Sequence, residues 1–200
     1  MIGSNKNILI LGAGESGIGA AILAKKMGWC VYVSDRSEIS SENIKTLNDL
    51  DVNWEHKSHT YNDLSNINLV VKSPGIPDDI DLIVNLKNRG ISVISEIEFG
   101  GLYNKAKTIC VTGSNGKTTT VKWIYSMLKN ANINVGLAGN VGDSFAKQVA
   151  EKQVDWFVLE LSSFQLDGIV DFSPDIAILT NITPDHLDRY NNSFESYVES

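Results

Sequence analysis

The segment Val111–Thr118, VTGSNGKT, carries the residue types best suited to bind phosphate groups. It follows an apolar run and ends in Gly-Lys-Thr, where a helical pattern begins. The backbone amides of such a loop and the ammonium group of Lys117 hold phosphate oxygens, and the Thr118 hydroxyl can reach Mg²⁺. The strict spacing of the phosphate-loop motif is not met, because Val111 stands where its first glycine would be. We interpret the loop as a shortened variant and predict a nucleoside triphosphate site.

Two later strand-like runs end in polar residues that such a site needs. Glu160 follows the run Asp155–Leu159, and His186 lies beyond the run Asp175–Thr180. The carboxyl ends of parallel strands meet at one edge of a sheet, so we expect both side chains beside Lys117. A carboxylate there binds a metal ion or positions water. Because His186 lies in a loop among charged residues, we predict a metal ligand rather than a structural histidine.

A third strand-like run, Asn134–Ala138, leads to Asn140. The side-chain amide of Asn140 can donate to a substrate carbonyl or shape the turn, and we favour donation to a substrate. The other histidines, His56 and His59, lie in the polar stretch EHKSHT without a partner pattern. We interpret them as surface residues.

An earlier glycine loop, LGAGESG, follows an apolar run and opens a helix. Gly12 permits the tight turn, Gly14 lets the backbone approach a diphosphate, and Gly17 lets helix and strand pack closely. The start of the helix favours an anion. Asp35 ends the next strand, where a carboxylate accepts hydrogen bonds from ribose hydroxyls. The pattern predicts a nucleotide site but does not distinguish NAD from another diphosphate nucleotide.

Two features near this loop need separate interpretation. Glu15 places a carboxylate beside the expected diphosphate, and unit charges 4 Å apart interact by roughly 4 kcal/mol at an effective dielectric constant of about 20. Glu15 must therefore point to solvent, or the charge of the ligand lies elsewhere. The stiff turn Ser73–Pro77 follows a strand, where ligands bind in such sheets, but turn chemistry alone explains it equally well.

The elements that must position these residues alternate between short apolar runs and helical patterns, which predicts parallel βαβ units and an α/β fold. We expect a Rossmann-like domain over residues 1–95 and an incomplete P-loop-type ATPase domain over 96–200, joined by a helical connector at Ser95–Lys107. The expected strands are Asn7–Leu11, Cys30–Ser34, Asn68–Lys72, Ile91–Ile94, Thr108–Val111, Asn134–Ala138, Asp155–Leu159 and Asp175–Thr180. The expected helices of the first domain are Gly17–Gly28, Ser40–Leu50 and Asp79–Arg89.

Composition narrows the classes of protein. The 200 residues carry a net charge of −7 without a Lys/Arg run, which argues against a nucleic-acid surface. Cys30 and Cys110 lie in apolar runs and are interpreted as buried thiols. No stretch approaches the roughly 20 apolar residues of a membrane span. We expect a soluble cytoplasmic monomer.

The last residues, NNSFESYVES, predict an opening helix capped by Ser193. Phe194, Tyr197 and Val198 form one apolar face, with nothing after it to pack against. The second half also has few strands for a doubly wound sheet, where roughly 5–6 are usual. We expect the chain to be a fragment.

Together these motifs resemble the Mur ligase family over essentially the whole chain, most closely its D-glutamate-adding member. The segments that carry the resemblance are LGAGESG with Asp35, SPGI at 73–76, TGSNGKTTT at 112–120, AGNVG at 138–142, LELSSFQL at 159–166 and NITPDHLDRY at 181–190. The resemblance implies an ATP-dependent ligase of peptidoglycan synthesis that joins D-glutamate to UDP-N-acetylmuramoyl-L-alanine through an acyl phosphate.

The resemblance also implies roles for individual residues. The first domain would bind the UDP part of the substrate, not NAD, through Glu15, Ser16, Asp35, Arg36 and Gly75. The family often has an apolar residue at the position of Glu15, which leaves that contact open. ATP would be held by Gly113, Ser114, Asn115, Gly116, Lys117, Thr118 and Thr119. Thr118 and Glu160 would bind one Mg²⁺ and His186 a second, with Lys117, Glu160 and His186 catalytic. Asn140, Ser162 and Gln165 would face the muramoyl-alanine part.

Parts of the family's machinery fall outside this sequence. A carbamylated lysine would lie just beyond Ser200, and the domain that receives the amino acid would follow. We therefore expect no ligase activity from the 200 residues alone. The alternatives are another Mur-type ligase, a folylpolyglutamate synthase, an NAD(P)-dependent oxidoreductase, or a non-catalytic nucleotide-binding module. The folate enzyme lacks a comparable first domain, and an oxidoreductase leaves the second loop unexplained.

Overall fold

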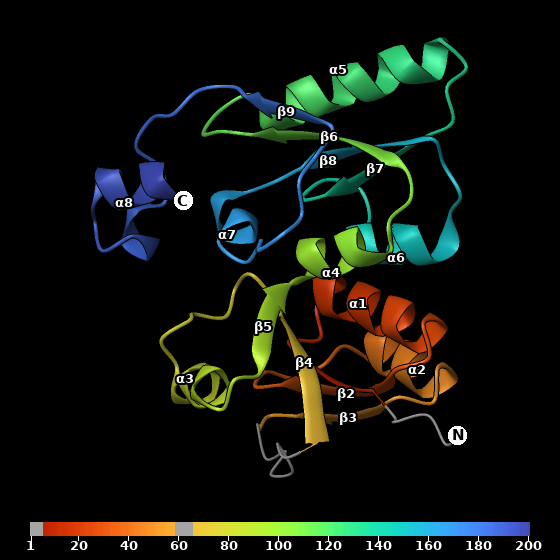
Figure 1. The fold of residues 1–200 in the computed structure, drawn as a ribbon, viewed down its shortest axis with the longest axis vertical. Coiled ribbons are helices and arrows are strands. Elements are labelled where there is room, and N and C mark those ends of the chain that lie inside the picture. Colours follow the sequence, from red (N-terminus) through yellow and green to blue (C-terminus); the bar gives the residue numbers. More distant parts are fainter. Residues whose placement is uncertain (1–5, 59–65) are drawn as a thin grey trace.

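The computed structural model describes residues 6–58 and 66–200 and contains two parallel β-sheets (Figure 1). The first sheet has the order β3-β2-β1-β4-β5 and the second the order β7-β8-β6-β9. The strands of the first sheet are β1 (Asn7–Leu11), β2 (Cys30–Asp35), β3 (Asn53–His56), β4 (Ile67–Lys72) and β5 (Ser92–Ser95). Those of the second are β6 (Lys107–Thr112), β7 (Val135–Gly139), β8 (Trp156–Glu160) and β9 (Ile176–Leu179).

Helices connect the strands and cover both faces of each sheet. The helices are α1 (Glu15–Lys26), α2 (Ser41–Asp49), α3 (Asp81–Asn88), α4 (Glu96–Tyr103), α5 (Lys117–Asn130), α6 (Phe145–Glu151), α7 (Ser163–Leu166) and α8 (Phe194–Glu199), with a 3₁₀ turn η2 (Leu187–Arg189). The predicted α/β class with parallel sheets is confirmed.

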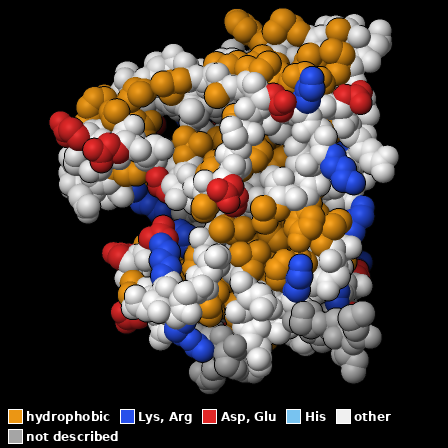
Figure 2. All heavy atoms as spheres, in the orientation of Figure 1, with side chains coloured by type: hydrophobic (Ala, Val, Ile, Leu, Met, Phe, Trp, Pro, Cys, Tyr) orange, Lys and Arg blue, Asp and Glu red, His pale blue; other side chains and the backbone are white. Residues whose placement is uncertain are grey.

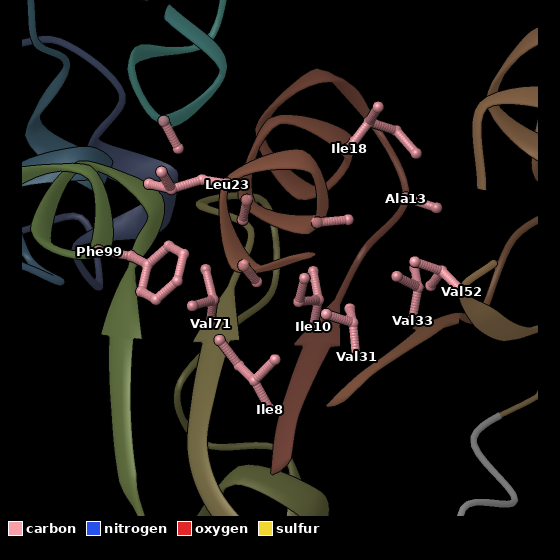
Figure 3. Packing of buried hydrophobic residues seen from close by; sticks show 14 of the residues in the cluster. Ile8, Ile10, Ala13, Ile18, Leu23, Val31, Val33, Val52, Val71 and Phe99 are labelled. Atoms are coloured by element: carbon pink, nitrogen blue, oxygen red, sulfur yellow. The ribbon is translucent and has the colours of Figure 1, made fainter. Parts of the chain in front are cut away.

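The central strand β1 is apolar throughout because helices bury it on both sides. Ile8 and Ile10 point into a cluster that includes Leu23 of α1, as Figure 3 shows. Leu9 and Leu11 alternate to the other face and pack with Ile83 and Leu86 of α3. A continuous apolar run thus produces a strand with two buried faces, and its carboxyl end delivers the first glycine loop.

The second sheet is built the same way. Phe157 and Leu159 of β8 pack with Phe145 of α6, whereas Val158 points to the other face and packs with Val121 of α5. Glu160 ends the buried strand β8 and therefore lies at the same edge of the sheet as the loop that follows β6.

Helices α1, α4 and α6 pack together between the two sheets (Figure 1). Glycine makes the approach possible, since a Cβ atom at Gly19 of α1 would lie 1.8 Å from the Ser144 hydroxyl oxygen. A Cβ atom at Gly100 of α4 would lie 2.7 Å from the ring of Phe145. The buried carboxylate of Glu96 accepts hydrogen bonds from the Ser144 hydroxyl at 2.7 Å and the Ala146 amide at 2.5 Å. These contacts join the two parts of the chain.

Three expectations need correction. Cys30 is exposed, because it begins β2 and only later residues of that strand lie beneath the helices, whereas Cys110 is buried as predicted. His56 is half-buried and belongs to the unexpected strand β3, and His59 lies outside the described residues. The apolar face of α8 is not left unpacked: Tyr197 is buried and stacks on Phe194. None of the described helices is long and apolar enough to cross a membrane.

Candidate functional site

The second glycine loop joins β6 to α5, at the edge of the sheet where the parallel strands end. Gly113 has a φ of +126°, and a Cβ atom there would lie 2.3 Å from the Thr180 hydroxyl oxygen. Gly116 precedes the helix with a φ of +85°. Both backbones lie in the left-handed region, which glycine adopts without strain. The glycines therefore allow a tight loop that presents the start of α5.

Lys117 is the first residue of α5, and its side chain folds back over the loop. Its ammonium group donates to the carbonyl oxygens of Gly113 at 2.5 Å and Ser114 at 3.0 Å. The positive charge therefore lies above the loop, beside the amides at the helix start. Both features favour an anion at this place.

Thr118, Glu160 and Asn140 come together from three different strand ends. The Thr118 hydroxyl donates to the Glu160 carboxylate at 2.7 Å, and the Asn140 amide donates to its other oxygen at 3.0 Å. Gly139 makes room for this arrangement, since a Cβ atom there would lie 2.2 Å from the Glu160 carbonyl oxygen. Glu160 is only 2% exposed. In the structure the Asn140 side chain thus orients Glu160, and its contact with a substrate stays a prediction.

Ser114 and Asn115 tie the loop to the segment after β9. The Ser114 hydroxyl donates a hydrogen bond to the Thr183 carbonyl oxygen at 2.8 Å. It also shares a hydrogen bond of 2.8 Å with the phenol group of Tyr197. The Asn115 amide donates to the side chain of Asn181 at 3.0 Å. The Ser114 side chain is therefore committed to protein contacts. The link to Tyr197 was not foreseen, because nothing in the sequence shows that α8 returns to this loop.

His186 lies beyond β9, at the same side of the molecule as Glu160. Its backbone is left-handed, with a φ of 48°, and its side chain is exposed. Its described side-chain contacts are with Asp185 at 3.7 Å and with the ring of Phe164, at a centroid distance of 5.2 Å. The described contacts do not include one between His186 and either Thr118 or Glu160. Of the three predicted metal ligands Thr118, Glu160 and His186, the described contacts therefore join only Thr118 and Glu160.

Ser162 and Gln165 shape the turn after Glu160. The Gln165 side-chain oxygen accepts from the Ser162 amide at 3.0 Å and from its hydroxyl at 3.2 Å. Gln165 is buried, and this local bond fixes the start of α7. Their predicted contact with a substrate stays a prediction.

The oxygen donors at this site suit magnesium bound together with phosphate. Mg²⁺ is held by one or two carboxylates, water and substrate phosphates rather than by a cage of protein ligands. The Thr118 hydroxyl and the Glu160 carboxylate supply such hard oxygen donors. Within residues 6–58 and 66–200, no group of three or more His, Cys, Asp and Glu side chains could hold a metal ion. The two oxygen donors of Thr118 and Glu160 fit a metal that is shared with a phosphorylated ligand.

The first glycine loop lies at the carboxyl end of β1, and polar side chains bind both the amide and the carbonyl group of its residue Ala13. The Asp35 carboxylate accepts from the Ala13 amide at 2.6 Å, and the Asn43 amide donates to the Ala13 carbonyl at 2.8 Å. A Cβ atom at Gly17 would lie 1.8 Å from the Gly12 carbonyl oxygen, which explains the close packing predicted for that glycine. Asn43 was missed, because an asparagine within a helical pattern gives no signal of its contact with a loop.

The turn Ser73–Ile76 packs beside this loop. The Ser73 amide donates to the Leu11 carbonyl at 2.9 Å, and a Cβ atom at Gly12 would lie 2.4 Å from the Ser73 hydroxyl oxygen. Strand β1 lies between β2 and β4, so the chain crosses to opposite sides of β1, and ligands bind at such switch points. A Cβ atom at Gly14 or Gly75 would meet nothing within 4 Å. The backbone is therefore open to a ligand at both glycines.

The remaining residues predicted for this site surround the loop. Glu15 is exposed, as its charge requires, and Ser16 is half-buried in the first turn of α1. Arg36 is exposed and directly follows Asp35. The structure thus places them at one sheet edge with Gly75, while their contacts with a ligand stay predictions.

Comparison with known protein families gives two matches that together cover most of the chain. The family model described as "Mur ligase MurD-like, N-terminal domain" matches residues 6–95. The model described as "Mur ligase middle domain" matches residues 111–200. The two matched ranges contain the two glycine loops.

Curated relatives share about half of their residues with the chain. The UDP-N-acetylmuramoylalanine--D-glutamate ligase of Christiangramia forsetii is 54% identical over 195 residues, which are 98% of this chain and 44% of the relative. The protein of the same name from Bacteroides fragilis is 53% identical over the same shares. The chain therefore spans less than half the length of these relatives.

Solved structures share the fold. The UDP-N-acetylmuramate:L-alanyl-gamma-D-glutamyl-meso-diaminopimelate ligase from Neisseria meningitides matches 98% of this chain and 68% of its own, with a TM-score of 0.62 and 22% identity. The UDP-N-acetylmuramate-alanine ligase from Thermotoga maritima matches 97% of this chain and 45% of its own, with a TM-score of 0.61 and 24% identity. At these identities the likeness concerns the fold alone.

Proposed function

Because the chain belongs to the Mur ligase family, we propose that it is the part of an ATP-dependent ligase that binds UDP-N-acetylmuramoyl-L-alanine and ATP. The whole protein would join D-glutamate to this substrate and form a C–N bond in peptidoglycan synthesis. The names of the relatives that are about half identical over 98% of the chain support this choice of substrate. We assign residues 1–95 to a UDP-sugar domain and 96–200 to the ATP-binding domain.

The observation that carries the proposal is the contact between Thr118 and Glu160 beside the lysine loop. A hydroxyl at the start of α5 and a buried carboxylate at the end of β8 are joined at 2.7 Å, although 42 positions separate them. Lys117 and the helix start supply positive charge at the same place. A strand end, a glycine loop and a neighbouring carboxylate are the parts that phosphoryl transfer requires. We propose Gly113–Thr119 as the phosphate-binding residues and Thr118 and Glu160 as ligands of Mg²⁺.

The chemistry of this site follows from charge. The substrate's terminal carboxylate must approach the γ-phosphorus of ATP, and the repulsion between two anions opposes that approach. Two unit charges 4 Å apart repel by roughly 4 kcal/mol at an effective dielectric constant of about 20. Lys117 and the amides of the loop offset the charge of the phosphate oxygens and hold them in place. Bound Mg²⁺ would add positive charge at the same oxygens.

Attack by the carboxylate forms a bond to phosphorus and releases ADP. The resulting acyl phosphate carries a good leaving group, and the amine of D-glutamate displaces phosphate to form the amide. We propose that Asn140, Ser162 and Gln165 line the path of the muramoyl-alanine part, and that His186 would hold a second Mg²⁺. No residue of this chain is assigned to D-glutamate.

The first site has a runner-up interpretation, an NAD(P)-dependent oxidoreductase. A glycine loop with Asp35 at the next strand end suits either dinucleotide or UDP. The proposal favours UDP, since an oxidoreductase gives no use for Lys117, Thr118 and Glu160.

Isothermal titration of the 200-residue chain tests the proposal. Four ligands of the first site are compared: UDP, UDP-N-acetylmuramic acid, UDP-N-acetylmuramoyl-L-alanine and NAD. A fifth titration uses the non-hydrolysed ATP analogue AMPPNP with and without Mg²⁺. We expect the L-alanyl compound to bind more tightly than UDP-N-acetylmuramic acid, and AMPPNP to require Mg²⁺.

The outcomes separate the alternatives. Binding of NAD without binding of UDP would replace the ligase by an oxidoreductase. Tighter binding of UDP-N-acetylmuramic acid than of its L-alanyl derivative would indicate a Mur-type ligase that adds a different residue.

A further inference from the structure

One side chain links the second half of the chain directly to the first glycine site. Arg189, in η2 after His186, donates a 3.0 Å hydrogen bond from its guanidinium group to the carbonyl oxygen of Pro74. These two residues are 115 positions apart. Pro74 belongs to the turn Ser73–Ile76, which packs against the first glycine loop. The bond therefore joins the loop of DHLDRY to the turn that borders the UDP site.

The guanidinium group of Arg189 is held in place by an aromatic ring. Its central carbon lies 4.7 Å from the centroid of Phe164, a distance at which a flat cation stacks favourably. Phe164 in turn contacts His186 and lies nearly parallel to Tyr190, with ring planes 15° apart. Phe164 lies in α7, four positions after Glu160, so the ring that holds Arg189 belongs to the second half of the chain.

The contact borders a cleft between the two halves of the chain. A cleft of about 430 Å³ is lined by residues of both halves, among them Lys72, Pro74, Ile76, Phe164, Arg189 and Tyr190. Figure 2 shows the surface hollowed between the parts that carry α8 and α3. Arg189 thus lies where a ligand of the first site would extend toward the second.

Arg189 is not needed to hold the two halves together. The packing of α1 against α4 and α6 already joins them, through Gly19, Gly100 and the bonds of Glu96. The hydrogen bond to Pro74 lies on a different side of the junction and reaches only a turn. Its effect should therefore be local to that turn.

We infer that Arg189 is a positioning residue that fixes the Ser73–Ile76 turn against the first glycine loop and so prepares the UDP site from the second half of the chain. The inference rests on the proposed function for the identity of the ligand. The turn contains Gly75, whose backbone is open to a ligand, and a glycine next to a proline carbonyl moves easily when that carbonyl loses its donor. Arg189 acts on the ligand through the turn rather than by contact.

Two measurements on the 200-residue chain test this inference. The first is hydrogen exchange by NMR of the Ile76 amide, which donates to the Ser73 carbonyl across the turn, with the Ile18 and Thr120 amides as internal references. The second is isothermal titration with UDP, with Mg²⁺ and AMPPNP titrated separately. The variants are Arg189→Ala, Arg189→Lys and the control Arg89→Ala, which removes an exposed arginine at the end of α3.

We expect Arg189→Ala to speed exchange at Ile76 and weaken UDP binding by roughly fivefold, the effect of one lost hydrogen bond. Binding of AMPPNP and exchange at Ile18 and Thr120 should stay unchanged, as should every reading in Arg89→Ala. Arg189→Lys should resemble Arg189→Ala, because an ammonium group cannot stack flat on Phe164 while it reaches Pro74.

Three results would overturn the inference. Equal UDP affinity in Arg189→Ala and the unaltered chain would show that the contact with Pro74 does not prepare the site. Wild-type affinity in Arg189→Lys would mean that the charge acts on the ligand directly. If the unaltered chain binds no UDP, the proposed function fails at the first site. Exchange at Ile76 then still decides about Arg189, and exchange that does not change in Arg189→Ala rejects its role.

Discussion

The Thr118 hydroxyl at the start of α5 donates a 2.7 Å hydrogen bond to the carboxylate of Glu160 at the end of β8. Strands β6 and β8 are neighbours, so the two residues are carried to one place by the sheet. The bond holds the buried carboxylate toward the phosphate loop, with Asn140 bound to its other oxygen. Fold and chemistry meet in this pair, because the same parallel register that builds the core also assembles the oxygen donors.

Replacing Glu160 with Gln should separate binding of magnesium from the fold. The amide keeps an oxygen that can accept from Thr118, but it removes the negative charge that attracts a divalent cation. We expect Mg²⁺-dependent binding of AMPPNP to weaken by about tenfold or more, which corresponds to ~1.4 kcal/mol. Calorimetric titration measures the effect. Glu151→Gln, an exposed residue at the end of α6, is the control. Equal affinity in the Glu160→Gln chain would remove Glu160 from the metal site.

Two glycines of the first loop should respond differently to alanine. A Cβ atom at Gly17 would lie 1.8 Å from the Gly12 carbonyl oxygen, so Gly17→Ala must shift the backbone and should lower the free energy of unfolding by about 1–3 kcal/mol. At Gly14 the added atom meets nothing and φ is −77°, so Gly14→Ala should change stability by no more than about 0.5 kcal/mol. Urea unfolding measures both.

The same pair also tests the role of the loop in binding. Gly14→Ala should weaken UDP binding about tenfold, because the methyl group occupies space that the ligand needs. Unchanged UDP binding in this stable variant would mean that the diphosphate lies elsewhere.

The sequence predicts best the elements whose local pattern and tertiary surroundings agree. Strands β1 and β8 are short apolar runs that end in a glycine loop or a carboxylate, and burial on both faces produces that pattern. The phosphate loop is evident for the same reason: glycine is required where the backbone is left-handed, at Gly113 and Gly116. Neighbouring strand ends then place Thr118 beside Glu160 without further information.

Elements that depend on contacts distant in the chain were not predicted. Strand β3 consists of NWEH, a polar edge strand without alternation. Helix α6 is buried against both α1 and Phe157, so its apolar residues do not form one stripe. The bonds from Asn43 to Ala13 and from Arg189 to Pro74 join segments whose spacing in the sequence gives no sign of contact.

The buried carboxylate of Glu98 should contribute strongly to stability. One of its oxygens accepts backbone amides of Val170, Asp171 and Phe172, at 2.8, 3.1 and 3.0 Å. Glu98→Ala leaves these amides without their acceptor and should lower the free energy of unfolding by about 3 kcal/mol. Glu98→Gln keeps an acceptor oxygen and should lose clearly less. Thermal or urea unfolding measures the difference, and equal losses in the two variants would contradict the assigned role of the oxygen.

The carboxyl group of Glu96 should make stability depend on pH near neutrality. Burial, together with the smaller effect of the negative charge of Glu15, raises the pKa of Glu96 from 4.5 to about 7, against the hydrogen bonds from Ala146 and Ser144. The folded state therefore binds the proton more tightly than the unfolded state. The proton on Glu96 therefore stabilises the folded state fully below pH 4.5, and this stabilisation is lost as the pH rises to about 7. The loss in the free energy of unfolding is roughly 3 kcal/mol in total.

Glu96→Gln isolates this effect from the titration of other carboxyl groups. The amide cannot ionise and keeps an oxygen for the Ser144 and Ala146 donors, so the variant should gain stability relative to the unaltered chain as pH rises from 4.5 to 7. Urea unfolding over this range measures the difference between the two proteins. Glu15→Gln removes the neighbouring charge and should lower the pKa of Glu96, so that less stability is lost at high pH. A difference that stays constant with pH would mean that Glu96 ionises within the junction of α1, α4 and α6 without cost, and that water or a rearranged Ser144 reaches it there.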